Sequence, residues 1–159
     1  MIIRQAQSSD LEAIFMLGYD AWGEGDSKAA YLQGCQASPK YLQGQWYVLE
    51  SVDSQIVSAL ILYDFEANCH GVGSIATAPD FRGQGHATSL LTAVLQQIEK
   101  AQNSVVYLYS DIAPQWYVSM GFEALPPEHQ KYKTTLCMAR GQSLIEEMQK
   151  NGYQAPEYF

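Results

Sequence analysis

The sequence predicts a mixed α/β fold, in which helices flank a β-sheet. An alternating apolar run at Gly73–Thr77 is typical of a strand, and a loop with two glycines and an amphipathic helix follow it. A second strand, apolar enough to be buried on both faces, is predicted over Ser104–Ser110. A strand, a helix and a strand in this order predict a parallel pair with a right-handed crossover.

The helix after the glycine-containing loop has a clear periodicity. Its apolar side chains recur at the i, i+3, i+4, i+7 spacing of a helix with one buried face. These side chains are Ala87, Leu90, Leu91, Val94, Leu95 and Ile98. We therefore expect a strand, a glycine loop and a helix in direct succession.

Turn and capping residues divide the rest of the chain into further elements. Ser9–Glu12 has the pattern of a capping box, which predicts a helix that runs to about Trp22. Asp53 and Ser54 mark a turn between two strands, and Gly121 is expected to be the left-handed cap of a short helix. The remaining expectations are strands at Ile2–Gln5, Gln45–Glu50, Gln55–Phe65, His70–Ala78, Phe122–Leu125 and Tyr132–Ala139, and short helices that begin near Ala29, at Pro114 and after Ser143.

Length and composition fit a single soluble domain. The chain has 159 residues, 47% of them apolar, which is enough for one continuous core over residues 1–159. The apolar stretch at the amino end is too short for a signal peptide, and no run approaches membrane-spanning length. We expect a cytoplasmic protein.

Three cysteines and a net charge of −8 narrow the choice of partners. The wide spacing and odd number of the cysteines argue against a disulfide framework and against a zinc site, so no metal is expected. The acidic chain has no basic stripe, which argues against nucleic acid and acidic membrane surfaces as partners. The charge weakly favours an amine-bearing partner, although acidity also keeps a protein soluble.

The loop Arg82–Thr88, here called the glycine loop, has the features of an anion site. Gly83 and Gly85 allow a sharp turn close to a ligand, and the first turn of the following helix presents unpaired N–H groups. A P-loop would need Lys and then Ser or Thr after its second glycine, and a dinucleotide fingerprint would need Gly or Ala at Thr88. The sequence fits neither pattern well.

The residues Arg82–Ala87 resemble the Arg/Gln-x-x-Gly-x-Gly/Ala loop of the GCN5-related N-acetyltransferase (GNAT) family, which binds the pyrophosphate of acetyl-CoA. Pro79, three residues before the arginine, and the order of the predicted elements are similar to the family as well. The resemblance implies a mostly antiparallel sheet of six to seven strands with a splayed central parallel pair. Dimerisation is common in the family, although no heptad in this sequence indicates a homodimer.

A second segment, Ala113–Phe122, resembles the family's Phe/Leu-Tyr-x-x-x-Gly-Phe pattern. Tyr117 matches the tyrosine that typically protonates the departing thiolate. A phenol suits this role because its unperturbed pKa of about 10 lies above the thiol's value of about 8.5. The resemblance implies direct transfer of the acetyl group of acetyl-CoA to a primary amine of a small molecule or an amino-acid-like acceptor, through a tetrahedral intermediate.

The same resemblance assigns the residues that bind acetyl-CoA. It places the pantetheine arm along the strand before the glycine loop, where backbone groups can pair with it and stabilise the oxyanion. It places the pyrophosphate on the N–H groups of the loop. The expected cofactor-binding residues are Ile75, Ala76, Thr77, Arg82, Gly83, Gln84, Gly85, His86, Ala87 and Thr88.

The base that takes the proton of the amine is not identified by either motif. Asp111 is the first candidate, because it follows a strand that should end beside the acyl group. The other candidates are Glu66, Asp64, Glu24 and Asp26. Two alternatives to an enzyme of this kind stay open, namely a non-catalytic module that binds acyl-CoA and, less favoured, a nucleotide-binding enzyme.

Overall fold

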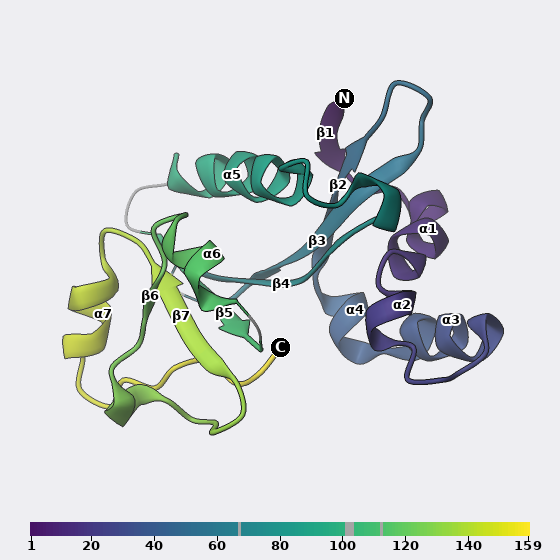
Figure 1. The fold of residues 1–159 in the computed structure, drawn as a ribbon. Coiled ribbons are helices and arrows are strands. Elements are labelled where there is room, and N and C mark those ends of the chain that lie inside the picture. Colours follow the sequence, from purple (N-terminus) through teal and green to yellow (C-terminus); the bar gives the residue numbers. More distant parts are fainter. Residues whose placement is uncertain (67, 101–103, 112) are drawn as a thin grey trace. The chain divides into compact units, whose positions relative to one another are not determined.

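Seven strands form one mixed sheet in the part of the chain that the computed structural model describes, residues 1–66, 68–100, 104–111 and 113–159 (Figure 1). Their order across the sheet is β1-β2-β3-β4-β5-β7-β6. The strands are β1 (Ile2–Gln5), β2 (Gln45–Glu50), β3 (Ile56–Asp64), β4 (Cys69–Thr77), β5 (Val105–Ser110), β6 (Glu123–Ala124) and β7 (Leu136–Arg140). Because β4 and β5 are parallel and the pairs β1–β2, β2–β3, β5–β7 and β6–β7 are antiparallel, the predicted mixed, mostly antiparallel sheet is confirmed.

The helices flank this sheet, as predicted. They are α1 (Leu11–Met16), α2 (Tyr19–Trp22), α3 (Lys28–Ala37), α4 (Pro39–Gln43), α5 (His86–Glu99), α6 (Pro114–Val118) and α7 (Leu144–Gln149). The chain divides into two compact units, of which the first is Met1–Tyr63 with Ser74–Leu95 and the second is Asp64–Gly73 with Gln96–Phe159. The single domain expected over residues 1–159 stays a prediction.

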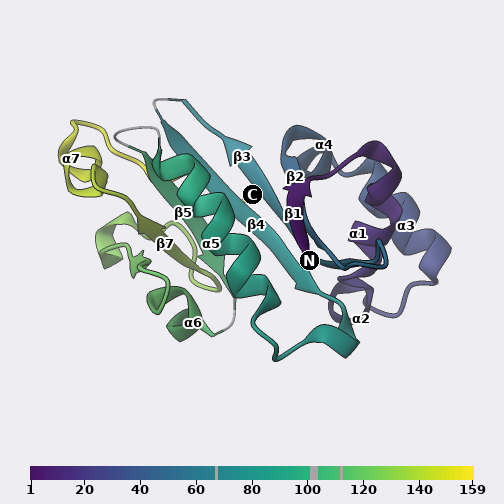
Figure 2. The same ribbon diagram turned by 90° about the horizontal axis from the view of Figure 1, so that it is seen from above.

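In the first unit, β1, β2 and β3 form an antiparallel meander beside the helices α1 to α4 (Figure 2). Val48 on β2 pairs with Ala59 on β3, and all three of Val48, Ala59 and the neighbouring Leu60 are fully buried. Apolar side chains on successive residues of β3 are typical of a strand that is covered on both faces. The turn predicted at Asp53–Ser54 is confirmed, and Ser54 adopts a left-handed φ of 61°.

The continuous helix expected from Ser9 to Trp22 is wrong. The chain forms α1 and α2 as separate helices, and α1 ends at Met16. The interruption lies at Gly18, where an added Cβ would be only 2.1 Å from the Trp22 ring. Close packing of the indole on the backbone therefore requires glycine at this turn. The helix α4 was not predicted.

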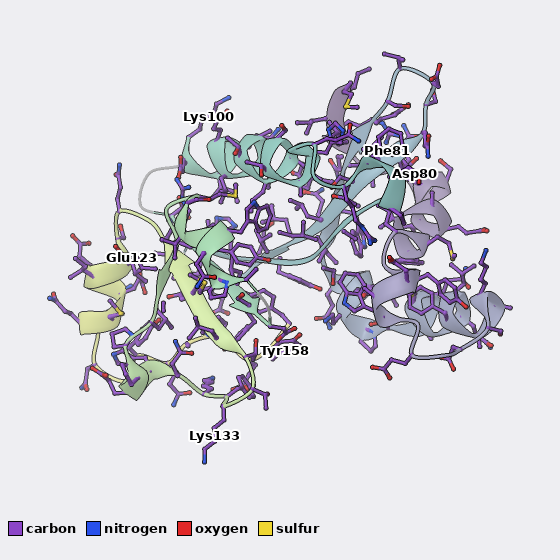
Figure 3. All side chains as sticks on the ribbon, in the orientation of Figure 1. Asp80, Phe81, Lys100, Glu123, Lys133 and Tyr158 are labelled. Atoms are coloured by element: carbon purple, nitrogen blue, oxygen red, sulfur yellow. The ribbon has the colours of Figure 1, made fainter. Side chains whose placement is uncertain are left out.

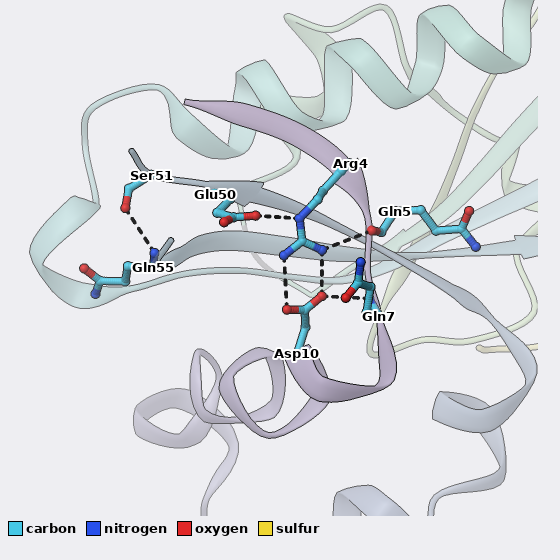
Figure 4. Close-up of polar contacts among 7 residues, drawn as sticks. All are labelled: Arg4, Gln5, Gln7, Asp10, Glu50, Ser51 and Gln55. Carbon is cyan, nitrogen blue, oxygen red and sulfur yellow. Dashed lines mark hydrogen bonds and ion pairs between the residues drawn. The ribbon is translucent and has the colours of Figure 1, made fainter. Parts of the chain in front are cut away.

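The capping box of this helical region is formed by Gln7 and Asp10, and not by Ser9 and Glu12 as predicted. The Asp10 carboxylate accepts a hydrogen bond from the backbone N–H of Gln7 at 2.7 Å, and a short 3-10 turn, Ser8–Asp10, precedes α1. Arg4 explains the shift, because its guanidinium binds both oxygens of Asp10, at 2.7 and 3.1 Å, while its Nε donates to Glu50 at 2.5 Å (Figure 4). This ion-pair cluster joins β1, β2 and the start of the helical region. The Arg4 guanidinium also holds the pKa of Asp10 below its ordinary value.

In the second unit, β4 and β5 pair in parallel over three positions, from Cys69 opposite Val105 to Gly71 opposite Tyr107. The splay expected beyond these positions stays a prediction. Residues of β5 and β7 form a hydrophobic core together with residues from the end of the chain. Its buried members are Val105, Tyr107, Leu125, Cys137, Ala139, Leu144 and Ala155, with Cys69, Tyr109, Met148 and Phe159 packed against them.

The short helix α6 begins at Pro114 and is followed by the left-handed Gly121, with a φ of 83°, as predicted. Proline suits a first helical position because the N–H that it lacks would have no helical partner there. Phe122, after the cap, is 1% exposed, and its ring contacts Tyr117 with 6.1 Å between centroids. The buried phenylalanine thus holds the helix and fixes the position of Tyr117 within the second unit.

The residues that the structure describes contain neither a membrane-spanning helix nor a group of metal ligands. Within them, no helix combines the length and the apolar character needed to cross a membrane. Among the same residues, no three His, Cys, Asp or Glu side chains are grouped so that they could hold a metal ion.

Candidate functional site

The glycine loop joins β4 to α5 within the first unit. Gly83 and Gly85 have φ values of 73° and 80°, in the left-handed region where only glycine avoids a steric cost. Among the described residues, no heavy atom lies within 4 Å of a Cβ added at either glycine, so the space beside the loop is open. The N–H of Ser89 makes the first helical hydrogen bond of α5, to Gly85 O at 2.9 Å. The amides of His86 and Ala87, in the first turn of α5, therefore precede this bond, at the end of the helix where anions are favoured.

The side chain of Arg82 is bound within the protein. Its two terminal nitrogens donate to the carboxylate of Asp20 on α2, at 2.7 and 2.9 Å, and its Nε donates to Thr77 O at 2.9 Å. The guanidinium therefore connects α2, the end of β4 and the glycine loop. The predicted contact between Arg82 and the cofactor stays a prediction. Asp20 was missed by the sequence analysis, because no local pattern points to a partner 62 residues away.

The end of β4 is also fixed by Ser58 on β3. The buried Ser58 hydroxyl donates to Ala76 O at 2.9 Å and lies 2.9 Å from the Thr77 hydroxyl. The carbonyls of Ala76 and Thr77 thus each accept a side-chain hydrogen bond, from Ser58 and Arg82. Since a carbonyl oxygen has two lone pairs, these bonds orient the strand and leave capacity for a second donor.

Ser74, in the middle of β4, has a φ of 46°, which is uncommon for a residue other than glycine. Its side chain hydrogen-bonds to the phenol of Tyr41, whose pKa is raised, mainly by burial. The left-handed residue interrupts the regular pleat of β4 just before the predicted pantetheine positions, Ile75–Thr77. Gly71 and Gly73, on the same strand, are the sequence signal that could have indicated this irregularity, because glycine inside a strand often marks a bulge.

Two polar side chains of the glycine loop, those of Gln84 and His86, contact residues of the turn before it. Gln84 donates to Asp80 O at 3.1 Å and so closes the turn. The His86 ring lies 6.0 Å from the Phe81 ring, and its buried Nε2 has no hydrogen-bond partner among the described residues. Gln84 and His86 thus contact Asp80 and Phe81 with their side chains, while the space around Gly83 and Gly85 stays open among the described residues.

Tyr117 and Asp111 lie together in the second unit. Burial, followed by the negative charge of Asp111, raises the pKa of Tyr117 to about 12. The phenol therefore keeps its proton throughout the neutral range. Asp111 is exposed, directly after β5, and its carboxylate accepts a hydrogen bond from the Tyr158 hydroxyl at 3.2 Å. The phenol and the carboxylate therefore interact electrostatically.

The other carboxylates considered as the base have different surroundings. Asp64 lies 2.7 Å from His70 Nδ1, and its side chain is 74% exposed. Glu66, Glu24 and Asp26 are exposed in loops. The structure thus brings together Ile75–Thr77 and the glycine loop in the first unit, and Asp111 and Tyr117 in the second unit.

A model of the family described as "Acetyltransferase (GNAT) domain" matches residues 2–125. This span covers most of the chain and includes the glycine loop, Asp111 and Tyr117. Among the solved structures with a similar fold, a putative N-acetyltransferase from Lactobacillus plantarum has a TM-score of 0.69 at 17% identity. The match covers 88% of this chain and 97% of that protein.

Two further structures have the same fold at low identity. The ribosomal-protein-S18-alanine N-acetyltransferase from Escherichia coli has a TM-score of 0.66 at 19% identity, over 90% of this chain and 97% of its own. The N-acetylglutamate synthase from Neisseria gonorrhoeae, complexed with coenzyme A and N-acetyl-glutamate, has a TM-score of 0.67 at 19% identity and matches 88% of this chain. The chain spans only about a third of that protein, 34%.

Proposed function

Because the chain belongs to the GNAT acetyltransferase family, we propose that it transfers the acetyl group of acetyl-CoA to a primary amine of a small molecule or an amino-acid-like acceptor. The observation that carries this proposal is the glycine loop, in which two left-handed glycines lead directly into the fourteen residues of α5. An open backbone turn at the start of a helix is suited to a pyrophosphate.

The loop fits acetyl-CoA in both shape and chemistry. Gly83 and Gly85 have no side chain that could fill the space above the loop, so a diphosphate can approach the backbone amides closely. The positive end of the α5 macrodipole adds to the attraction. Ile75, Ala76 and Thr77 precede the loop on β4, where their backbone would pair with the pantetheine arm. Arg82, through Asp20 and Thr77, holds the loop in the conformation that binds.

Tyr117 is the proposed general acid. The thiolate of CoA leaves when the tetrahedral intermediate collapses, and it needs a proton at that moment. A phenol whose pKa is raised to about 12 is protonated in the resting enzyme and can donate to this sulfur. Burial against Phe122 fixes the orientation of the ring.

Asp111 is the proposed base. An alkyl amine with a pKa near 10.4 enters almost entirely as an ammonium ion, so the nitrogen must lose a proton before it can attack the thioester. An exposed carboxylate that interacts electrostatically with Tyr117 is suited to accept this proton, directly or through water. The ammonium nitrogen gives one proton to the carboxylate, which releases it to solvent, and the free amine attacks the thioester carbonyl. As the carbon–sulfur bond breaks, the phenol protonates the thiolate, and the second proton that the new amide nitrogen loses restores the phenol.

A thiol-release assay with acetyl-CoA tests the proposal. Release of CoA would be followed over a panel of amino acids, polyamines, aminoglycosides and peptide amino termini. Acetylation of at least one primary amine, checked by mass spectrometry, is the expected result. Saturable binding of acetyl-CoA without turnover on any acceptor would instead favour a non-catalytic acyl-CoA-binding module. Preferential stabilisation by ATP or NAD over CoA in a thermal-shift assay would contradict both the acetyltransferase and the acyl-CoA-binding module.

A further inference from the structure

The segment Pro156–Phe159 is bound to the second unit by specific polar contacts. Tyr109 on β5 donates its hydroxyl hydrogen to Pro156 O at 2.5 Å. The Glu157 carboxylate accepts from Lys131 and from Tyr132, both at 2.6 Å, in the connection that precedes β7. The segment is therefore fixed both to the strand that leads to Asp111 and to the β6–β7 connection.

Tyr158 connects this segment to Asp111. Its hydroxyl donates to Asp111 Oδ2 at 3.2 Å, and its backbone N–H donates to the Tyr132 hydroxyl, also at 3.2 Å. Tyr158 is 47% exposed, and it lies close to the end of the chain in Figure 3. In the described part of the chain, no lysine or arginine forms an ion pair with Asp111. The carboxylate thus lies at the surface, beside an exposed aromatic ring and without a cationic side chain paired to it among the described residues.

Tyr109, Tyr132 and Tyr158, here called the tyrosine cluster, pack against one another. Their ring centroids are 5.3 Å apart for Tyr109 and Tyr158, 5.6 Å for Tyr109 and Tyr132, and 6.3 Å for Tyr132 and Tyr158. The faces of such rings attract cations, and a carboxylate does so more strongly. Lys131 neutralises Glu157, whereas Lys133, on the same connection, projects away from the body of the unit (Figure 3).

We infer that Asp111 and the tyrosine cluster form the surface that recognises the acceptor, and that this acceptor is an alkyl amine with a second positive charge and no carboxylate at its far end. The inference rests on the proposed function, in which Asp111 meets the reacting amine. Tyr158 acts as a positioning residue for Asp111, and its ring, with Tyr132, faces the second cationic group. A carboxylate at the far end would meet the negative faces of the rings and would be disfavoured.

Two acceptors of equal chain length test the charge preference. 1,5-Diaminopentane and 6-aminohexanoate present the same reacting amine on the same five-carbon chain, and they differ only in the charge of the far end. We expect the wild-type protein to acetylate the diamine with a kcat/KM at least about fivefold higher. An equal or higher kcat/KM for 6-aminohexanoate would overturn the inference.

Variants of Tyr158 test the role of the segment. Tyr158→Phe keeps the ring and loses the hydrogen bond to Asp111, and we expect the KM for the diamine to rise about fivefold while the KM for acetyl-CoA changes less than about twofold. Tyr158→Leu, which also loses the ring, should reduce the preference for the diamine over 6-aminohexanoate. Tyr153→Phe is the matched control, because it removes a hydroxyl of the same end of the chain that pairs with Tyr107. Equal KM values for the diamine in Tyr158→Phe and Tyr153→Phe would contradict the assignment.

Direct binding separates this inference from the proposed function. Ligand-observed NMR with 1,5-diaminopentane needs no turnover, so it reports on the surface even if the protein acetylates no amine. We expect binding by the wild-type protein and by Tyr153→Phe, and weaker binding by Asp111→Asn and Tyr158→Leu. Diamine signals that are the same for the wild-type protein and Asp111→Asn would overturn the inference, whatever the outcome of the thiol-release assay.

Discussion

Arg82 at the start of the glycine loop and Asp20 on α2 form a two-point ion pair, with nitrogen–oxygen distances of 2.7 and 2.9 Å. The third hydrogen bond of the guanidinium, to Thr77 O, ties the same side chain to the end of β4. Each partner stabilises the charge of the other, so the pKa of Asp20 is lowered and that of Arg82 is raised. The pair thereby fixes the position of the loop that we propose binds acetyl-CoA.

Replacing Asp20 by Asn should weaken the binding of acetyl-CoA without slowing the chemical step. The amide leaves only one acceptor oxygen and no charge, so the guanidinium loses its two-point contact and the loop its anchor. We expect the KM for acetyl-CoA to rise about three- to tenfold, with kcat changed less than about twofold. Steady-state thiol release at varied acetyl-CoA concentration measures both values.

A salt titration and a control variant show whether the effect of Asp20→Asn comes from the ion pair with Arg82. The two side chains are 47% and 45% exposed, so salt should screen the wild-type pair and reduce the difference between the two proteins. Glu12→Gln removes an exposed carboxylate of the same helical region and should leave both parameters unchanged. An acetyl-CoA KM in Asp20→Asn equal to that of the wild type would show that the pair does not position the loop.

Arg82 lies in a loop that the sequence predicts, whereas nothing near Asp20 in the sequence indicates that it is the partner of Arg82. Local patterns were sufficient for the glycine loop, because left-handed glycines and the start of an amphipathic helix are encoded by neighbouring residues. The strands β1 and β2 begin and end at the predicted residues, and β3, β4 and β5 are displaced by no more than one residue at either end. Strands and helices whose own apolar pattern indicates which residues are buried were therefore predictable.

Features that depend on distant partners were not predictable. The capping box of Gln7 and Asp10 was missed because the Asp10 carboxylate is held by Arg4 from another element. The break at Gly18 was missed because it depends on the packing of Trp22. The last strand, β7, begins at Leu136, four residues after its predicted start at Tyr132, whose hydroxyl is bound to Glu157. In each of these places, contacts between residues that are distant in the sequence determine the local structure.

Replacing Tyr117 by Phe should lower kcat and preserve the affinity for acetyl-CoA. The ring and its contact with Phe122 stay, while the proton for the leaving thiolate is lost, so we expect kcat to fall about tenfold or more. Stopped-flow thiol release and calorimetric titration with CoA separate the two effects. Tyr47→Phe, which removes a hydroxyl that donates to Gln45 within the first unit, serves as the control.

The pH dependence gives a second test of Tyr117. Its pKa is raised to about 12, first by burial and then by the charge of Asp111, so the acid should stay protonated as the pH rises through 8 and 9. The wild-type rate should therefore show no loss that depends on Tyr117 below about pH 11. A fall in the rate near pH 9 that disappears in Tyr117→Phe would argue against the raised pKa and against the assigned role.

Replacing Gly85 by Ala should weaken the binding of CoA directly, in addition to lowering the folding stability of the protein. Gly85 has a φ of 80°, and among the described residues nothing lies within 4 Å of an added Cβ, so the methyl group would project into the open space beside the loop. We expect a loss of about 1 kcal/mol in folding stability, from the left-handed backbone, together with weaker binding of CoA. Urea unfolding and calorimetry measure the two effects.

Gly25 is a matched control for Gly85. It has a φ of 87° and equally open surroundings among the described residues, but it lies in the turn before α3, outside the glycine loop. Gly25→Ala should lose a similar amount of stability and bind CoA as the wild type does. Equal CoA affinities for the two alanine variants would remove the main support for a pyrophosphate site at the loop.

Replacing Asp10 by Asn should destabilise the protein in a pH-dependent way. The Asp10 carboxylate accepts from both terminal nitrogens of Arg4, and the two side chains are only 13% and 28% exposed (Figure 4). We expect the free energy of unfolding to fall by about 1 to 2 kcal/mol at pH 7, since the amide loses the charge that the guanidinium requires. Urea unfolding followed by tryptophan fluorescence measures this difference, with the exposed Asp53→Asn as the control.

The sign of the pH effect follows from the pKa of Asp10. The Arg4 guanidinium lowers this pKa in the folded protein from the ordinary value of 3.8, so the unfolded chain binds the proton more readily. The carboxylate therefore contributes its full stabilisation above the unfolded value and loses it as the pH falls through the lower, folded value. The difference between the wild type and Asp10→Asn should be constant from about pH 8 to pH 5 and should narrow below about pH 4. A difference that grows toward acid pH would mean that the charge of Asp10 does not stabilise the fold.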